Sequence, residues 1–154
     1  MDEMFEFNTL LVPTDFSAMS RATFEQALRL ATGDDATVIV LHVLDSSLAE
    51  FVAKHELASR DNVIRQMRAR AEQKMSEYTS RAGAPVTIKA MISDGIPFLE
   101  IIDKARELLV DAVVIGKVGG RGALEKLLFG STAEKVIRGC SRPVIVLPID
   151  AEPQ

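Results

Sequence analysis

The sequence predicts an α/β protein built on an open, mainly parallel sheet. Two observations carry this prediction. Short apolar runs rich in β-branched residues alternate along the 154 residues with segments of helical periodicity. The best-defined of these runs, Thr37–Leu44, shows almost no polar alternation, which is typical of a parallel strand covered on both faces. We expect residues 1–154 to form a single domain, because this length suits one hydrophobic core.

The first third of the chain predicts two strands with a helix between them. Thr9–Val12 is the first predicted strand, and Pro13 interrupts it because proline cannot continue a central ladder. A helix follows from Ser20, and the turn at residues 33–35 ends it. Thr37–Leu44 is then the second strand. The predicted buried stripe of this helix comprises Phe24, Ala27, Leu28 and Ala31.

A long charged segment from Ser47 to Arg81 separates the second strand from the third. Its second half has the spacing of a helix with one buried face. Its first part, Leu48–Asp61, is less regular and is predicted to be a flexible excursion. The buried face comprises Ile64, Met67, Ala71, Met75 and Tyr78.

The second half of the chain supplies three more strands, namely Val86–Ile92, Ala112–Ile115 and Val144–Leu147. Asp94-Gly95 is predicted as a turn, and Pro97 suits the first turn of the next helix. A last helix precedes the fifth strand. The residues predicted to face inward from these two helices are Phe98, Ile101, Ile102, Ala105 and Leu109, and then Ala133, Val136, Ile137 and Cys140.

Strands that alternate with helices require crossover connections, which are right-handed and place helices on both faces of the sheet. The predicted architecture is therefore a Rossmann-like, five-stranded parallel sheet in the order 3-2-1-4-5. Ligands of such sheets bind beyond the carboxyl ends of the strands, where the strand order reverses. Pro13-Thr14-Asp15 follows the first strand and Gly116 follows the fourth, so we expect both to face one crevice.

Composition excludes several classes of protein. Eighteen Lys and Arg residues against 22 Asp and Glu give a net charge of −4, which offers no general attraction to nucleic acid or anionic lipid. The single cysteine, Cys140, cannot form an internal disulfide. No apolar run approaches the roughly 20 residues that span a bilayer. We therefore expect a cytoplasmic protein with neither a nucleic-acid nor a membrane partner.

The most informative segment is residues 113–132, VVIGKVGGRGALEKLLFGST. An apolar strand breaks at Gly116, passes through a glycine-rich loop, and reaches Gly130-Ser131-Thr132 before another helical pattern. Glycine lets the backbone approach a ligand closely, and a helix that starts at Ser131 offers unpaired N–H groups to an anion. The segment therefore predicts a phosphate-binding loop.

Plainer explanations exist for several of these residues. Asp15 could be only a turn or helix-capping residue, and Gly130-Ser131 only a helix start. Lys117 and Arg121 could pair with phosphates, although loop cations are usually just solvated. His42 is predicted to be a packed, hydrogen-bonded core histidine. The two histidines and one cysteine form no metal-binding pattern, so no metal site is predicted.

Five stretches, taken together, resemble the universal stress proteins. They are PTDFS at 13–17, LHV at 41–43, Gly95-Ile96-Pro97, the glycine loop, and the closing RPVIVLP at 142–148. The resemblance covers residues 8–148 in the family's order. It implies ATP binding for members with the motif G-x2-G-x9-G-(S/T), and a dimer formed through the last strand, here Val144–Leu147.

The loop departs from that motif by one inserted residue. Gly116-x2-Gly119 fits, but ten residues instead of nine separate Gly119 from Gly130, and counting from Gly120 restores the nine. Residue by residue, the resemblance implies adenosine beside Asp15 and Val43, ribose beside Ile115 and Gly116, and phosphates beside the glycines and residues 130–132. The implied binding residues are Pro13, Thr14, Asp15, Val43, Ile115, Gly116, Gly119, Gly120, Gly130, Ser131 and Thr132.

The sequence therefore favours a regulatory dimer for stress responses that binds ATP, with or without Mg²⁺, and switches with the bound nucleotide. Asp15 could orient a water, but no second catalytic group stands out, so at most slow ATP hydrolysis is expected. A nucleotide-free dimeric adaptor of the same fold is the main alternative, and a phosphotransfer enzyme is a weaker one. The protein partner cannot be identified from the sequence.

Overall fold

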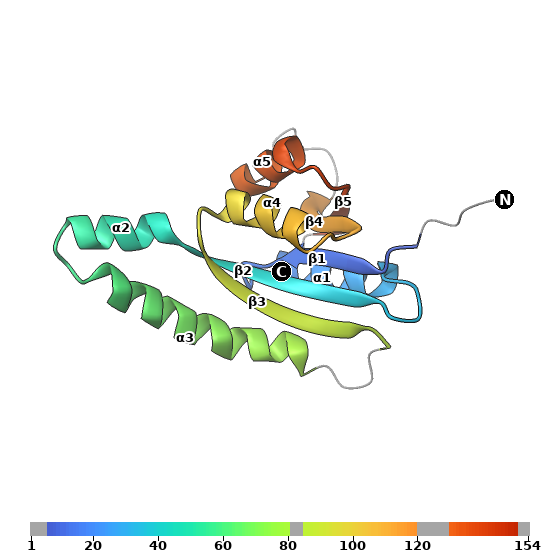
Figure 1. The fold of residues 1–154 in the computed structure, drawn as a ribbon, viewed down its shortest axis with the longest axis horizontal. Helices are drawn as coiled ribbons and strands as arrows, with labels where there is room; N and C mark the ends of the chain where they lie inside the picture. The colour runs from blue at the N-terminus through green and yellow to red at the C-terminus, as the bar shows by residue number, and fades with distance from the viewer. Residues whose placement is uncertain (1–5, 81–84, 120–129, 151–154) are drawn as a thin grey trace.

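A computed structural model of the chain describes residues 6–80, 85–119 and 130–150. Its centre is a five-stranded parallel sheet in the order β3-β2-β1-β4-β5, which confirms the predicted topology (Figure 1). The strand order reverses between β1 and β4. The strands are β1 (Thr9–Pro13), β2 (Thr37–Asp45), β3 (Thr87–Gly95), β4 (Ala112–Gly119) and β5 (Val144–Asp150).

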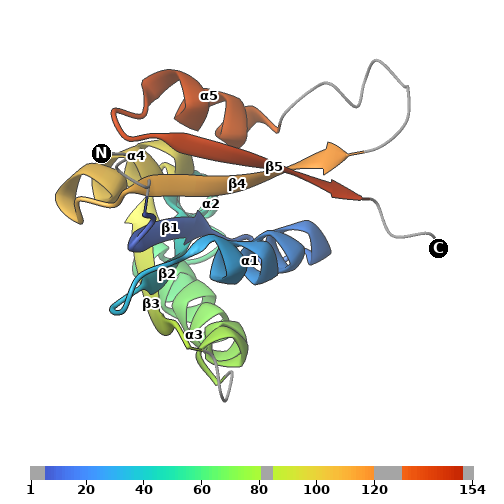
Figure 2. The same cartoon turned by 90° about the vertical axis from the view of Figure 1, so that its right-hand side faces the viewer.

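Helices pack on both faces of this sheet (Figure 2). Phe24 and Tyr78 belong to the core between the sheet and α1 and α3, which we call the α1/α3 core. Ile101 and Val136 belong to the α4/α5 core on the opposite face. The helices are α1 (Ala18–Leu30), α2 (Ser46–Lys54), α3 (Arg60–Thr79), α4 (Pro97–Glu107) and α5 (Ser131–Gly139).

The central strands are buried on both faces, as their unbroken apolar sequences predicted. Leu10, Leu11 and Val12 of β1 are fully buried, and their side chains alternate between the two cores. Leu11 lies in register with Ile39 of β2 and with Val113 of β4. Because β1 carries no polar side chain in this stretch, both helix layers are held against it by burial of apolar surface.

The prediction that the fourth strand breaks at Gly116 is wrong. β4 continues to Gly119 and stays in unbroken register with β5, from Val113 opposite Val144 to Gly119 opposite Asp150. The pairing with β1 covers only the start of β4. Glycine was expected to end the strand, but the neighbouring β5 supplies backbone partners throughout this stretch, so the ladder carries on past it.

The flexible excursion predicted for Leu48–Asp61 is also wrong. Ser46–Lys54 forms α2, capped by the Asp45 side chain, which accepts a hydrogen bond of 3.0 Å from the Ser47 N–H. Together with the start of α3, α2 projects beyond the sheet (Figure 1). Ala49 is its only buried residue, whereas Phe51 is 57% exposed. The helix was missed because it lacks a buried apolar stripe.

Smaller corrections concern element ends. Asp94-Gly95 belongs to β3 instead of a separate turn, since both residues pair with the end of β2. Leu109, predicted to face inward, is 68% exposed, and Val110 is buried in its place. Ile137, predicted on the inner stripe of α5, is 37% exposed. Leu109 lies beyond the end of α4, where the chain has left helical geometry, whereas Ile137 lies within α5 next to the buried Val136.

Candidate functional site

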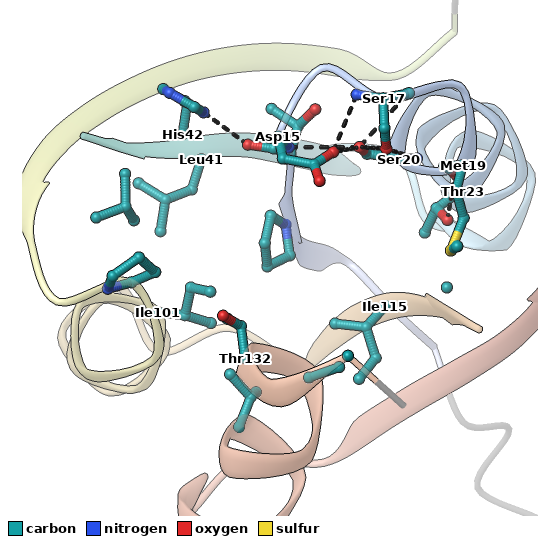
Figure 3. Close-up of a pocket in the computed structure, with 18 of the residues that line it drawn as sticks. Asp15, Ser17, Met19, Ser20, Thr23, Leu41, His42, Ile101, Ile115 and Thr132 are labelled. Atoms are coloured by element: carbon teal, nitrogen blue, oxygen red, sulfur yellow. Dashed lines mark hydrogen bonds between the residues drawn. The ribbon is translucent and has the colours of Figure 1, made fainter. Parts of the chain in front are cut away.

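A cavity of about 460 Å³ lies at the carboxyl ends of β1 and β4, where the strand order reverses (Figure 3). Its walls come from the β1–α1 loop, the first turns of α1, the end of β2, and the starts of α4 and α5. A cavity in this position is the usual ligand site of an open parallel sheet.

Most residues predicted from the sequence lie around this one cavity. The cavity lining includes Pro13, Thr14, Asp15, Val43, Ile115, Gly116, Gly130, Ser131 and Thr132. Gly119 is the last residue of β4, and its relation to the cavity stays a prediction. Gly120 and Arg121 lie outside the described residues. The topology therefore joins segments that stand more than a hundred residues apart in the sequence.

The β1–α1 loop is held in place by Thr14. Its buried hydroxyl lies 2.8 Å from the hydroxyl of Tyr78 and accepts a hydrogen bond of 3.0 Å from the Phe16 N–H. The Thr14 carbonyl lies 2.7 Å from Nδ1 of His42, which places the proton on that nitrogen. His42 is hydrogen-bonded, as predicted, but it is half-buried and lines the cavity instead of lying in the core. Phe16 adopts φ +66°, so this network supports a loop conformation that non-glycine residues rarely adopt.

The Asp15 carboxylate sits at the start of α1 and faces the cavity (Figure 3). It accepts hydrogen bonds from the Ser17 N–H at 2.9 Å and from the Ser20 hydroxyl. Partial burial raises the pKa of Asp15, but the hydrogen bonds from Ser17 and Ser20 together outweigh it and hold that pKa below its ordinary value. Asp15 is therefore ionised at neutral pH, and it stabilises the turn whether or not it also contacts a ligand.

Part of the cavity wall is apolar. Side chains from four elements meet there, and none of them carries a hydrogen-bonding group. A flat, weakly polar group such as a purine ring would fit against such a surface, with backbone groups of the strand ends supplying polar contacts. These side chains are Leu41, Val43, Ile101, Ile115 and Val136.

The amino-terminal end of α5 closes another side of the cavity. The helix begins at Ser131, as predicted, and Gly130 caps it without any side-chain hydrogen bond. The first helical hydrogen bond runs from the Glu134 N–H to the Gly130 carbonyl at 3.0 Å. The N–H groups of residues 131–133 therefore have no partner within the helix, and together with the helix dipole they favour an anion.

Gly116 has a packing role in addition to its place in the cavity. A Cβ atom built on it would lie 2.3 Å from Oγ1 of Thr23, and that hydroxyl is fixed by donating to the Met19 carbonyl at 2.8 Å. Thr23 is 1% exposed, so it has no room to move. Glycine is therefore required for α1 to pack closely on β4.

Several cavity residues were not predicted as ligand contacts. Those from α1 lie within its first two turns, directly after the predicted Pro13–Asp15 segment. The capping residue Ser17 marks the start of this helix in the sequence and could have indicated them. The others come from β2, from α4 and from α5. They are Ser17, Met19, Ser20, Thr23, Leu41, His42, Pro97, Ile101, Ala133 and Val136. Lys117, which the sequence left open as a phosphate contact, also lines the cavity.

No group of three or more His, Cys, Asp or Glu side chains in residues 6–80, 85–119 and 130–150 is arranged to hold a metal ion. Within the same ranges, no helix combines the length and the apolar character needed to cross a membrane.

Comparisons with known proteins agree on one family. The model of the universal stress protein family matches residues 6–148. Universal stress protein MJ0531 of Methanocaldococcus jannaschii is 29% identical over 142 residues, which covers 92% of this chain and 82% of that protein. The solved structure of hypothetical protein MJ0577, from the same organism, superposes with a TM-score of 0.78 at 26% identity, covering 97% of this chain and 100% of the other.

A universal stress protein from Archaeoglobus fulgidus, solved in complex with dAMP, has the same fold. Its TM-score is 0.57 at 23% identity, and the match covers 93% of this chain and 98% of that one. Since the family model covers nearly the whole chain and the sheet has the predicted order, this chain belongs to the universal stress protein family.

Proposed function

We propose that the protein binds an adenine nucleotide in the cavity at the β1/β4 switch point. The observation that carries this proposal is the pairing of two environments in one cavity. An apolar surface that includes Val43 and Ile115 faces the same space as the free N–H groups at the start of α5. A nucleotide has the matching halves, a flat base and an anionic phosphate.

The charges of the cavity suggest how the nucleotide would lie. The ionised carboxylate of Asp15 repels phosphate, so phosphate belongs at the α5 end and the nucleoside nearer Asp15. Gly130, Ser131 and Thr132 would then hold phosphate through backbone N–H groups and hydroxyls. The dAMP complex of the Archaeoglobus fulgidus relative supports an adenine nucleotide as the ligand class.

ATP is the nucleotide we propose, because the family resemblance of the glycine loop points to the ATP-binding members. Mg²⁺ would accompany the ATP phosphates as their counter-ion. Asp15 is the one carboxylate among the described cavity residues. We infer a regulatory role in place of turnover. His42, the one histidine among the described residues of that lining, has Nδ1 bound to the Thr14 carbonyl, and the Asp15 carboxylate is held by Ser17 and Ser20. Binding would shift the protein between conformations by differential affinity.

We further propose that the protein works as a cytoplasmic homodimer joined through β5. The strand lies at the edge of the sheet and pairs only with β4 among the described strands. Its outer edge therefore leaves backbone groups available for pairing with a second chain. The subunit contact would lie in β5. Its neighbour β4 lines the cavity, so nucleotide binding and the dimer contact would be close enough to influence each other.

The first experiment is to denature the purified protein and identify released small molecules by mass spectrometry. The emptied protein is then titrated with ATP and Mg²⁺ while thermal unfolding is followed, with GTP as the control. ATP at a hundredfold excess over Kd should stabilise the protein by about 2.7 kcal/mol. No released nucleotide and no response to ATP would overturn the proposal and favour the nucleotide-free adaptor.

A double variant tests the position of the phosphates. A Cβ at Gly130 would meet no atom within 4 Å, so Gly130→Val combined with Ser131→Ala should leave the free protein folded. The new side chain would stand beside the N–H groups that we assign to phosphate. We expect the ATP-induced thermal shift to be lost while the melting temperature of the free protein stays within a few degrees of wild type. An undiminished shift would place the phosphates elsewhere.

A further inference from the structure

We infer that the Lys117 ammonium group binds phosphate and makes the site select phosphorylated adenosine over adenosine itself. This inference rests on the proposed nucleotide site and assigns its phosphate specificity to one side chain. Lys117 lies in the extension of β4 that the sequence analysis expected to be loop. In a loop the direction of its side chain would be undefined, whereas in a strand it is fixed.

Strand alternation places Lys117 on the α5 side of the sheet. Val113 and Ile115 both pack in the α4/α5 core, and Lys117 is the next residue of that series. The pairing with β5 contains no bulge from Val113 to Gly119, so the alternation is not interrupted. Val144 and Val146, which lie opposite Val113 and Ile115, belong to the same α4/α5 core, and this confirms the direction.

The same cavity brings Lys117 together with the start of α5. Lys117, Gly130, Ser131 and Thr132 all line it. Lys117 is half-buried, and it makes no hydrogen bond or ion pair with any residue in the described ranges. An ammonium group without a partner among the described residues favours an anionic ligand, and the helix terminus that lines the same cavity favours the same charge.

The overall charge pattern of the cavity supports phosphate as that anion. Lys117 is the single lysine or arginine among the described residues that line it, and Asp15 is the single carboxylate. Asp15 lies on the β1–α1 loop, whereas Lys117 and α5 lie across the switch point from it. A ligand with a neutral body and one anionic end is complementary to this arrangement. Adenosine would leave Lys117 without a partner.

Lys117→Met isolates the contribution of the charge, because methionine retains a long unbranched apolar side chain. Lys89→Met is the matched control: Lys89 is an exposed strand lysine on β3 that does not line the cavity, and its loss changes the net charge equally. The affinities of wild type and both variants for AMP, ATP and adenosine are measured by isothermal titration calorimetry on protein freed of ligand. Thermal unfolding of each free protein is recorded alongside.

We expect Lys117→Met to weaken AMP and ATP binding about tenfold or more, the loss typical of a hydrogen bond to a charged group. Adenosine affinity should change less than twofold, and Lys89→Met should leave all three ligands unaffected. Lys117→Arg, which keeps the charge, should retain most of the AMP affinity. If Lys117→Met loosens adenosine and AMP equally, or neither, the inference is wrong although nucleotide binding stands. If wild type binds none of the three ligands, the proposed function itself fails.

Discussion

The hydroxyl groups of Tyr78 and Thr14 lie 2.8 Å apart, although 64 residues separate them in the sequence. Tyr78 comes from the last turn of α3, and Thr14 begins the loop that carries Asp15. Both side chains are buried, so the hydrogen bond replaces water that neither group can reach. Through this contact α3, which lines no part of the cavity, supports one of its walls.

Tyr78→Phe should therefore destabilise the protein by about 1 kcal/mol. Phenylalanine keeps the ring that packs edge-on against Phe24 at 4.9 Å, so the loss reports the hydroxyl alone. Urea unfolding of the free protein measures this change. The same substitution should weaken nucleotide binding, because it loosens Thr14 and the loop beside it.

Thr14→Val is the matched control for that hydrogen bond. It removes the other hydroxyl, and in the double variant the pair is absent altogether. Because a buried group left without its partner costs more than the absence of both groups, the double variant should be less destabilised than the sum of the two single ones. Strict additivity of the two effects would show that the hydrogen bond contributes nothing.

The second prediction concerns Gly116 and Gly130, which both line the cavity. Gly116→Ala places a Cβ 2.3 Å from Oγ1 of Thr23 and should destabilise the protein by about 1–3 kcal/mol through overpacking. Gly130→Ala meets no atom within 4 Å at a position of negative φ and should cost less than about 1 kcal/mol. Urea unfolding of both variants provides the comparison.

A second substitution identifies the cause of the Gly116 effect. Thr23→Ala removes the oxygen that the new Cβ would strike, so it should recover part of the stability that Gly116→Ala loses. Equal destabilisation by the two glycine variants, or no recovery in the Thr23 background, would contradict close packing of α1 on β4 as the reason for glycine at this position.

The strands and helices could be predicted from the sequence where burial produces a regular pattern of apolar residues. Leu10–Val12 of β1 and Val38–Leu41 of β2 are unbroken apolar runs because helices cover both faces, and α4 begins at Pro97 as its sequence predicted. Where the pattern depends on a neighbour, the sequence was not sufficient. From the sequence alone Gly116 was expected to end the fourth strand, but pairing with β5 keeps it within the strand. α2 buries only Ala49 and leaves Leu48 and Phe51 exposed, so its apolar residues do not mark a side that packs on the core.

The same limit applies to the cavity. Pro13–Asp15 and Gly130–Thr132 were predicted because turn residues and a helix start are local signals. Ile101 and Val136 also line the cavity, but in the sequence they cannot be distinguished from other core residues of an amphipathic helix. The role of Lys117 was left open, because the direction of its side chain depends on whether β4 is still a strand at that residue. Only the register with β5 decides this.

The third prediction is a pH dependence carried by Asp15. Its folded-state pKa lies below the ordinary value of 3.8, so the unfolded chain binds the proton more readily than the folded one. Its stabilising contribution is therefore complete above that value and is lost as the pH falls through the lowered pKa. The difference in unfolding free energy between wild type and Asp15→Ala should be constant from pH 5 to pH 7 and should shrink below about pH 4.

Urea unfolding of the free protein at each pH measures this difference, with Asp34→Ala as the control. Asp34 is exposed in the turn before β2, and no described hydrogen bond or ion pair involves it. Its substitution should show a smaller change over the same range. A gap between wild type and Asp15→Ala that widens towards low pH would contradict the hydrogen-bonded, ionised state of Asp15.

The last prediction concerns Leu109, which occupies a position normally suited to glycine. Its φ is +51°, and it follows the carboxyl end of α4 in a regular Schellman arrangement. The Val110 N–H donates to the Ala105 carbonyl at 3.3 Å, and the Leu109 N–H donates to the Arg106 carbonyl at 3.2 Å. Val110 and Ala105 are both fully buried, which supplies the apolar contact that accompanies this motif. The helix end is therefore well fixed, with a strained residue at its turning point.

Leu109→Gly should stabilise the protein by about 0.5–1 kcal/mol, because relief of the left-handed strain exceeds the extra freedom of glycine in the unfolded chain. Since the leucine side chain is 68% exposed, little buried surface is lost. Leu109→Ala is the control: it removes the same side chain but keeps the Cβ that causes the strain, so it should bring no gain. If alanine stabilises as much as glycine in urea unfolding, removal of an exposed apolar side chain is responsible instead of the positive φ.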